Sequence, residues 1–171
     1  MARVGAFAIL LPKAAWRMPT LKADRFSPYA RTMTLHITTR ENPSEADREA
    51  VLAPLRAYNI SCAGDPHIRP VAVLLTDQDG DHTGGLWGKC GYDWLFVELP
   101  VVPEKHRGAK YGKALMEQAE SIARANDCIG IWLDTFEFQA RGFYEKLGFE
   151  LFGALDDHPI GQKRFFLRKR F

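Results

Sequence analysis

One stretch of the sequence combines glycine with basic residues in the way that anion-binding loops do. The strand-like run Trp94 to Val102 is followed by the loop Pro103 to Gly112, which carries Lys105, Arg107 and Lys110. A helical pattern begins at the end of this loop. The first N–H groups of a helix have no acceptor within the helix, and the helix dipole adds positive charge at the same end. The sequence therefore predicts that the loop binds an anion.

Glu98 is a second residue that could do chemistry. It is a single carboxylate inside an otherwise apolar strand, two residues before Pro100, which cannot donate a hydrogen bond to a neighbouring strand. A carboxylate held beside a substrate can act as a general base. The alternative is a side chain that merely reaches solvent at the end of a strand.

These residues depend on a framework that the apolar pattern predicts. Within residues 111–123, the positions of one predominantly apolar face recur with the 3.6-residue period of a helix. A helix is also expected after Asn42 or Ser44, split or kinked at Pro54, and a short one over 140–147 ends at Gly148. Strands are expected at 35–39, 71–75, 85–90, 94–102, 128–133, 149–152 and 163–171. This order of elements indicates a mixed α/β fold.

Composition argues against several classes of protein. The 171 residues are 46% hydrophobic, but no apolar run reaches the roughly 18 residues that a membrane span needs, so we expect a soluble domain without a membrane partner. Cys62, Cys90 and Cys128 are isolated and the histidines are scattered. This spacing argues against a metal site or a disulfide framework and fits a cytoplasmic protein.

The basic residues are unevenly distributed along the chain. Residues 1–32 hold six basic residues and one acid, so the remainder offers no basic surface for nucleic acid. Three interpretations of this tail stay open: a secretory signal, an organelle transit segment, or a leader ahead of a natural start at Met33, which we favour. We assign a basic tail, disordered or a leader, to 1–32 and a domain to 33–171. In a weaker hypothesis the tail itself binds nucleic acid or a membrane surface.

Two motifs together resemble those of the GNAT superfamily of acyl-CoA-dependent N-acyltransferases. Val101 to Leu115 resembles the family's pyrophosphate loop, usually Arg/Gln-x-x-Gly-x-Gly/Ala, and Phe143 to Phe149 resembles its YEKLGF segment. The order of the predicted elements agrees from Thr34 to Phe171. The resemblance implies a GNAT-like mixed, mostly antiparallel central sheet with helices on both faces. The nearest resemblance is to a small bacterial branch whose acceptors are mostly unassigned.

The resemblance implies that acetyl-CoA is the co-substrate and that no metal takes part. Lys110 departs from the pattern, because the family usually has glycine there. Its side chain could crowd the pyrophosphate, or its ammonium group could add a phosphate contact, and the sequence leaves both open. The residues expected to bind acetyl-CoA are Leu99, Val101, Arg107, Gly108, Ala109, Lys110, Tyr111, Gly112 and Lys113.

The resemblance also gives Glu98 and Tyr144 catalytic roles. An amine with a pKa of about 10.4 is almost fully protonated near neutral pH, so acyl transfer to it needs a base. Glu98 matches the acidic position that often supplies this base. Tyr144 matches a tyrosine that protonates the departing thiolate in many members, although it could instead pack beside Phe143. Backbone N–H groups near Leu99 are expected to bind the thioester carbonyl as it becomes an oxyanion.

The acceptor is the least determined part of the prediction. We expect Trp87, Asp134 and Phe136 to contact it, although aromatic residues on strands more often belong to the core. Asp134, with acids at 137, 156 and 157, would form an acidic rim suited to a cationic amine, or else a solvated loop. The predicted function is direct acetyl transfer to a primary amine of a small, cationic molecule or peptide, with a homodimer possible. The alternatives are a non-catalytic acyl-CoA-binding module and a transferase that uses another acyl-CoA.

Overall fold

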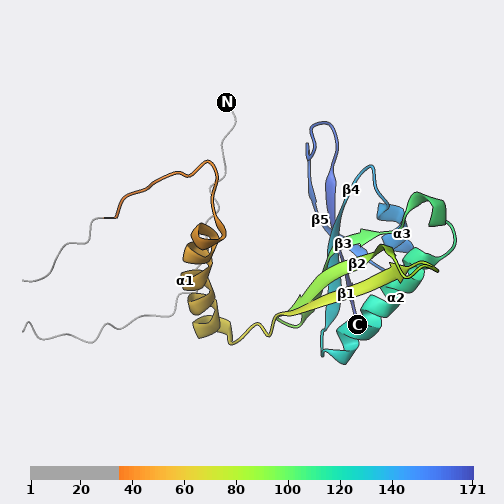
Figure 1. The fold of residues 1–171 in the computed structure, drawn as a ribbon, viewed down its shortest axis with the longest axis horizontal. Helices are drawn as coiled ribbons and strands as arrows, with labels where there is room; N and C mark the ends of the chain where they lie inside the picture. The colour runs from red at the N-terminus through yellow and green to blue at the C-terminus, as the bar shows by residue number, and fades with distance from the viewer. Residues whose placement is uncertain (1–34) are drawn as a thin grey trace, which may run out of the picture. The chain divides into compact units, whose positions relative to one another are not determined.

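The computed structural model describes residues 35–171 of the chain (Figure 1). The predictions for residues 1–32, including a start at Met33, lie outside the described residues. None of the described helices is long and apolar enough to cross a membrane. The elements are α1 (Glu45–Ala63), β1 (Arg69–Thr76), β2 (His82–Gly91), β3 (Trp94–Val101), the short 3-10 helix η1 (Glu104–His106), α2 (Tyr111–Ala125), β4 (Gly130–Phe136), α3 (Arg141–Lys146), β5 (Glu150–Leu155) and β6 (Arg164–Arg170).

Six strands form one mixed sheet in the order β1-β2-β3-β4-β6-β5. Every neighbouring pair is antiparallel except β3 and β4, which run parallel and are connected through α2. A parallel pair needs such a crossover because the chain must return to the end of the sheet from which the first strand started. The expected mixed, mostly antiparallel sheet is confirmed, as are the strands predicted from residue 71 onward.

The core lies between α2 and one face of the sheet, called here the inner face. Leu115, Met116 and Ala119 of α2 are buried, and so are Leu95 of β3 and Leu133 of β4, which expose almost no surface. Burying a leucine or methionine side chain supplies roughly 1.5–3 kcal/mol, and these contacts hold β3, α2 and β4 as one unit. The site residues that follow these strands are therefore attached to the best-packed part of the molecule.

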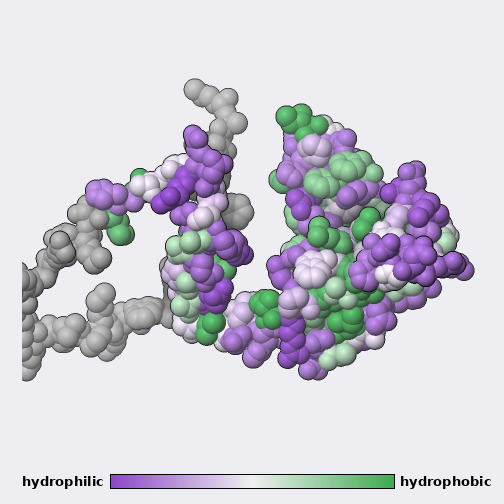
Figure 2. Space-filling view, viewed as in Figure 1, coloured by the Kyte–Doolittle hydropathy of each residue, from purple (hydrophilic) through white to green (hydrophobic). Residues whose placement is uncertain are grey.

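The opposite face of the sheet, called here the outer face, is less covered. In β4 the buried side chains alternate with half-buried Trp132, Asp134 and Phe136. Trp132 stacks on Phe96 of β3 with 3.7 Å between the ring centroids. Figure 2 shows apolar side chains reaching the surface between hydrophilic borders in the strand-rich part of the molecule. A helix over the outer face stays a prediction.

Helix α1 starts as the sequence indicates but is not split by its proline. Ser44 accepts a hydrogen bond from the N–H of Asp47, whose carboxylate accepts from the N–H of Ser44, and this reciprocal pair caps the helix. The helix continues without interruption through Pro54, and none of its side chains is buried.

The prediction of a strand at residues 35–39 is wrong. Residues 35–40 form no strand, and Leu35 and Ile37 are almost fully exposed. The strand preference of such residues depends on side-chain packing against neighbouring strands more than on the backbone itself, and none of the described strands pairs with this segment.

Candidate functional site

β3 and β4 stop pairing before either strand ends. Their parallel register runs from Trp94 opposite Gly130 to Val97 opposite Leu133, whereas β3 continues to Val101 and β4 to Phe136. Residues 98–101 and 134–136 therefore border a region without hydrogen bonds between the two strands, called here the strand opening. Backbone N–H and C=O groups left unpaired there are available to a bound molecule.

An extra residue in β3 changes which side chains face outward at the strand opening. Gly88 of β2 pairs with Val97 and the adjacent Trp87 pairs with Leu99, so Glu98 has no partner and forms a β-bulge. Strict alternation after the buried Val97 would turn Leu99 inward, but the bulge places it opposite Trp87 on the outer face. The side chains of Leu99 and Val101 are 66% and 55% exposed. The expected co-substrate strand therefore presents bare apolar side chains beside unpaired backbone.

The loop before α2 presents a run of free N–H groups. No acceptor in the described part of the chain takes the N–H groups of residues 108–113, and the first bonded N–H of α2 is that of Ala114, 3.1 Å from the Lys110 carbonyl oxygen. Gly108 and Lys110 both have positive φ angles, +80° and +66°. Successive N–H groups in such a conformation, at the positive end of a helix, form a concave anion site. The loop geometry thus fits the pyrophosphate that the sequence led us to expect.

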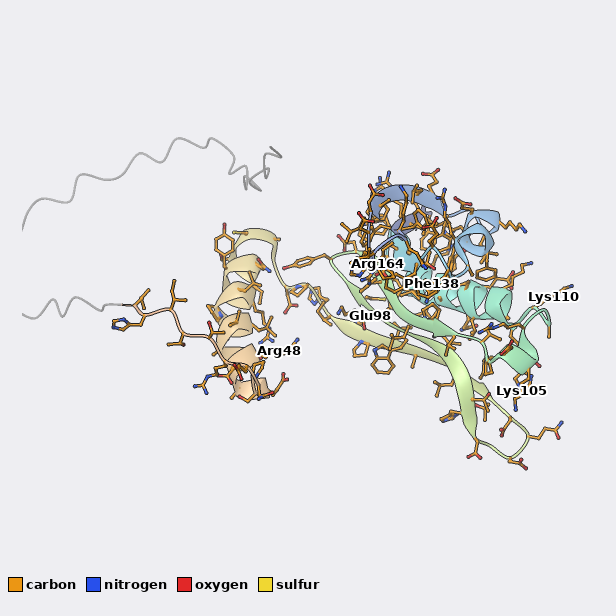
Figure 3. The ribbon with its side chains drawn as sticks, turned by 90° about the horizontal axis from the view of Figure 1, so that it is seen from above. Arg48, Glu98, Lys105, Lys110, Phe138 and Arg164 are labelled. Atoms are coloured by element: carbon orange, nitrogen blue, oxygen red, sulfur yellow. The ribbon has the colours of Figure 1, made fainter. Side chains whose placement is uncertain are left out.

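Lys110 keeps the backbone conformation that glycine would have at its position. Its φ and ψ angles of 66° and 4° are left-handed, and the residue is exposed. A lysine can adopt this conformation at a cost of roughly 1–2 kcal/mol. Lys110 thus has a left-handed backbone conformation, which glycine adopts at lower cost. Figure 3 shows Lys110 at the loop that leads into α2.

The two motifs noted in the sequence contact each other. A Cβ atom added to Gly112 would lie 3.2 Å from the Phe143 ring of α3 and 3.9 Å from Val102. Only glycine lets the start of α2 approach Phe143 this closely without displacing the ring. The second motif therefore supports the loop as well as supplying Tyr144.

Tyr144 is buried among aromatic rings beside the strand opening. It contacts Phe143 and Phe149 edge-on, and no described residue hydrogen-bonds to its hydroxyl group. Burial raises the pKa of Tyr144 to about 12, and the nearby Asp134 carboxylate adds to this rise. The hydroxyl group is therefore protonated at every physiological pH and has a proton to donate to an acceptor.

The raised pKa of Tyr144 predicts a late phase in an alkaline titration. Because the folded protein binds this proton more tightly than the unfolded chain, the associated stability is complete below about pH 10 and is lost as pH rises toward 12. In an absorbance titration of tyrosinate, we expect Tyr144 to ionise near pH 12. Tyr144→Phe should remove that last phase alone, and loss of an earlier phase instead would contradict the assignment.

Glu98 faces outward at the bulge and is ion-paired. Its Oε1 atom lies 2.5 Å from Nζ of Lys89 on β2, and its side chain is 27% exposed. Lys89 also lies 5.8 Å from the centre of the Phe96 ring. The carboxylate therefore reaches the strand opening while held by a neighbouring strand, as a general base needs to be.

The expected acceptor residues lie on the outer face, but the acidic rim is not free. Trp87 is exposed opposite Leu99, and Phe136 stacks between Phe138 and His158. Each predicted rim carboxylate already has a partner within the chain. Asp134 pairs with Arg164, Glu137 accepts from the N–H of Lys163, Asp156 pairs with the Lys163 ammonium group, and Asp157 accepts from the N–H of Gly161.

The buried cysteines, Cys90 and Cys128, are in environments that make a thiol unreactive. Burial raises the pKa of Cys128 to about 12, with the neighbouring Cys90, Asp93 and Asp127 acting in the same direction. A thiol with such a pKa carries almost no thiolate near neutral pH. Within residues 35–171, no group of three or more His, Cys, Asp or Glu side chains is placed to hold a metal ion.

These environments predict the thiol count of the native protein. Cys62 is exposed, whereas Cys90 and Cys128 are buried. An aromatic disulfide reagent near neutral pH should titrate one thiol quickly in the folded protein and all three in denaturant. Rapid reaction of two or more native thiols would contradict the burial of Cys90 and Cys128. So would a fast-reacting thiol that persists after Cys62→Ser.

Three residues that the structure brings to the strand opening were not predicted from the sequence. Lys89 contacts Glu98 across β2 and β3, and Arg164 contacts Asp134 across β6 and β4. Phe138 lies just beyond β4 and stacks on Phe136. The position of Lys89 two residues after Trp87 puts both on one face of a strand, and this was the one local signal available.

Comparison with known proteins agrees with this geometry. The family model for the acetyltransferase (GNAT) family matches residues 32–149. An acetyltransferase of Agrobacterium fabrum is 37% identical over 128 residues, which span 75% of this chain and 93% of the relative. The blasticidin-S acetyltransferase of Streptomyces morookaense is 39% identical over 97 residues, 54% of this chain and 71% of the relative. A crystal structure of an acetyltransferase from Bacillus cereus superposes with a TM-score of 0.71 at 30% identity, covering 78% of this chain and 98% of that one. The chain therefore belongs to the GNAT family of acetyltransferases.

Proposed function

We propose that the protein transfers the acetyl group of acetyl-CoA directly to the primary amine of a small molecule or peptide. The observation that carries this proposal is the continuity of residues 97–113. A strand that leaves its partner β4 after Val97 leads there into six consecutive N–H groups that have no acceptor within residues 35–171. The exposed Leu99 and Val101 lie between the two. One segment thus offers an apolar path for the pantetheine arm and an anion cradle for the pyrophosphate.

Glu98 accepts a proton from the incoming ammonium group, directly or through water, and the free amine attacks the thioester carbon. As the C–N bond forms, the carbonyl oxygen becomes an oxyanion and accepts hydrogen bonds from β3 backbone. Pro100 has no N–H, so the proposed donors are the N–H groups of its neighbours Leu99 and Val101. Apart from Glu98, the side chains here are apolar, so the oxyanion is stabilised by main-chain groups.

Tyr144 acts when the C–S bond breaks. Its hydroxyl group hydrogen-bonds to the departing sulfur and gives it a proton, and the proton lost by the new amide nitrogen restores the hydroxyl group. With a tyrosine pKa of about 12 and a thiol pKa of about 8.5, the first transfer alone is uphill by about 5 kcal/mol. The two transfers must therefore be coupled, which balances the reaction at one proton released per amide formed.

Direct transfer without an acetyl-enzyme intermediate is supported by the state of the cysteines. Cys90 and Cys128 are buried, and Cys128 has a pKa of about 12, while Cys62 lies in α1, where the Tyr58 hydroxyl is the titratable group beside it among residues 35–171. None of the three is an activated nucleophile.

The proposal is tested by mixing the full chain with acetyl-CoA and a panel of amino acids, peptides, polyamines, aminoglycosides and nucleoside antibiotics. Thiol release should match the amount of acetylated amine found by mass spectrometry, and Tyr144→Phe should lower the rate by about tenfold or more. Tight acetyl-CoA binding without any acetylated product would support a non-catalytic acyl-CoA-binding module. Faster release from propionyl-CoA or a longer acyl-CoA would change the donor assignment.

Lys110 offers a separate test of the loop. Lys110→Gly is expected to raise the free energy of unfolding by about 0.5–1 kcal/mol, because the relief of left-handed strain exceeds the added chain entropy. Lys110→Ala keeps the strain and removes the ammonium group. At low salt both variants should bind acetyl-CoA about threefold more weakly, as expected for an exposed charge, and the difference should vanish at high salt.

Binding measured by calorimetry and unfolding measured in denaturant separate the two effects of Lys110. If either variant bound acetyl-CoA more tightly than the natural protein, the Lys110 side chain would be crowding the pyrophosphate, and the alternative of a phosphate contact would be wrong.

A further inference from the structure

Two ion pairs flank the strand opening on the outer face. Val97 and Leu133 form the last β3–β4 pair, so Glu98 and Asp134 follow it on the two diverging strands. Glu98 is held by Lys89 from β2, and Asp134 is held by Arg164 from β6. Each carboxylate at the opening is thus already neutralised by a cation from the strand beside it. Figure 3 shows Glu98, Phe138 and Arg164 in the same part of the sheet, away from Lys110.

The Arg164 side chain is fixed by Asp134, and one end of its guanidinium group still has N–H groups for a bound molecule. Its Nε and Nη2 atoms lie 2.7 and 2.6 Å from the same oxygen, Oδ1 of Asp134. The guanidinium group lies 5.0 Å from the Phe136 ring centre and 6.0 Å from that of Phe166. Its side chain is 32% exposed. The other end of the guanidinium group consists of Nη1, which lies 3.5 Å from His158, and the second N–H of Nη2. This end is therefore held in place and reachable.

Only one of the two carboxylate oxygens of Asp134 is bonded to Arg164. Both polar contacts of Arg164 with Asp134 converge on Oδ1, and no described residue donates a hydrogen bond to Oδ2. The pair therefore presents one anionic oxygen and one cationic edge within a few ångströms of each other. A partner that carries both charges satisfies such a pair better than a polycation, which would repel Arg164 and find the neighbouring carboxylates occupied.

Two other basic residues of β6 also lie on the outer face. Arg168 and Arg170 alternate with inward residues on the same face as Arg164, and neither makes an ion pair within residues 35–171. They lie over the aromatic rings of Phe152 and Trp94. The outer face thus carries two further cations, which lie opposite Trp132 and Gly130 of β4 rather than at the strand opening.

We infer that the acceptor carries a carboxylate as well as its reactive amine, and that Arg164 binds that carboxylate end-on while Asp134 Oδ2 orients the amine toward Glu98. This inference rests on the proposed acetyl transfer and replaces the cationic acceptor that the acidic rim had suggested. It makes Arg164 a specificity-determining residue. The acceptor class is therefore small amino acids and related amino-carboxylates.

Matched acceptors that differ only by a carboxylate test this inference. We would compare kcat/KM for ornithine against putrescine and for phenylalanine against phenethylamine, using the full chain and saturating acetyl-CoA. The expected preference for the carboxylate-bearing member is about tenfold or more, as for other charge-assisted pairs. Arg164→Met should bring the ratio in each pair to near one, and Arg164→Lys should restore part of it.

Arg170→Met is the matched control, because it removes the same charge from the same face of β6, six residues away. It should leave the ratios unchanged. Equal or faster turnover of the decarboxylated member by the natural protein overturns the inference while acetyl transfer stands. Turnover of other amines but of neither member of a pair also overturns it. Absence of acetyl transfer to every amine in the wider panel would remove the proposed function itself.

Discussion

Replacing Glu98 by glutamine should lower kcat at neutral pH by about 10²- to 10³-fold while leaving the affinity for acetyl-CoA unchanged. Loss of a positioned general base commonly costs this much. The isosteric amide keeps the bulge residue's size, and Lys89, which is 48% exposed, can be solvated when its partner loses charge. The fold should therefore survive, which a thermal unfolding curve checks.

The defect of Glu98→Gln should shrink as pH rises. A primary amine with a pKa of about 10.4 becomes its own free base near that pH, so the enzyme no longer needs to remove the proton. Initial rates measured from pH 6 to pH 10 should show the two proteins converging. Glu150→Gln, which alters an exposed acid on β5, is the control and should follow the natural protein throughout. A Glu98→Gln rate within threefold of the natural protein at pH 7 would contradict the role of base.

The second large effect concerns the loop that holds the co-substrate. Gly108 has a φ angle of +80°, and a Cβ atom added there would meet nothing within 4 Å. Gly108→Ala therefore acts only through the backbone, where the left-handed conformation becomes costly by roughly 1–2 kcal/mol. A loop that relaxes from this conformation no longer aims its N–H groups at one point. We expect acetyl-CoA to bind about tenfold more weakly.

Gly80 provides a control with matched geometry. It lies in the β1–β2 turn with a φ angle of +91° and also has no atom within 4 Å of an added Cβ. Gly80→Ala should cost similar stability and leave acetyl-CoA affinity unchanged in calorimetric titrations. Equal affinities of the Gly108 and Gly80 variants would mean that the loop's conformation does not matter for binding.

Local sequence patterns predicted the parts of the site that lie within one segment. The strand from Trp94, the loop to Gly112 and the helix after it form where the apolar period and the glycine positions indicate, because each is determined by neighbours along the chain. Burial of Tyr144 on a short helix also followed its apolar spacing.

Contacts between strands could not be predicted in this way. The bulge at Glu98 exists only relative to the pairing with β2, and it determines that Leu99 faces outward. The partners of Glu98 and Asp134 come from other strands, so the acids of the predicted rim looked free in the sequence. The first strand, predicted at 35–39, failed for a related reason, because a strand needs a neighbour to pair with.

The most direct test of this account is the equilibrium affinity of the full chain for acetyl-CoA compared with S-acetyl-pantetheine, which lacks the pyrophosphate and nucleotide. If residues 108–113 cradle the pyrophosphate, acetyl-CoA should bind saturably with one site per chain, and acetyl-pantetheine should bind at least about 100-fold more weakly, a loss of roughly 2.7 kcal/mol. Gly108→Ala should weaken only acetyl-CoA. Equal affinity for the two molecules, or no saturable binding of acetyl-CoA, would contradict the account.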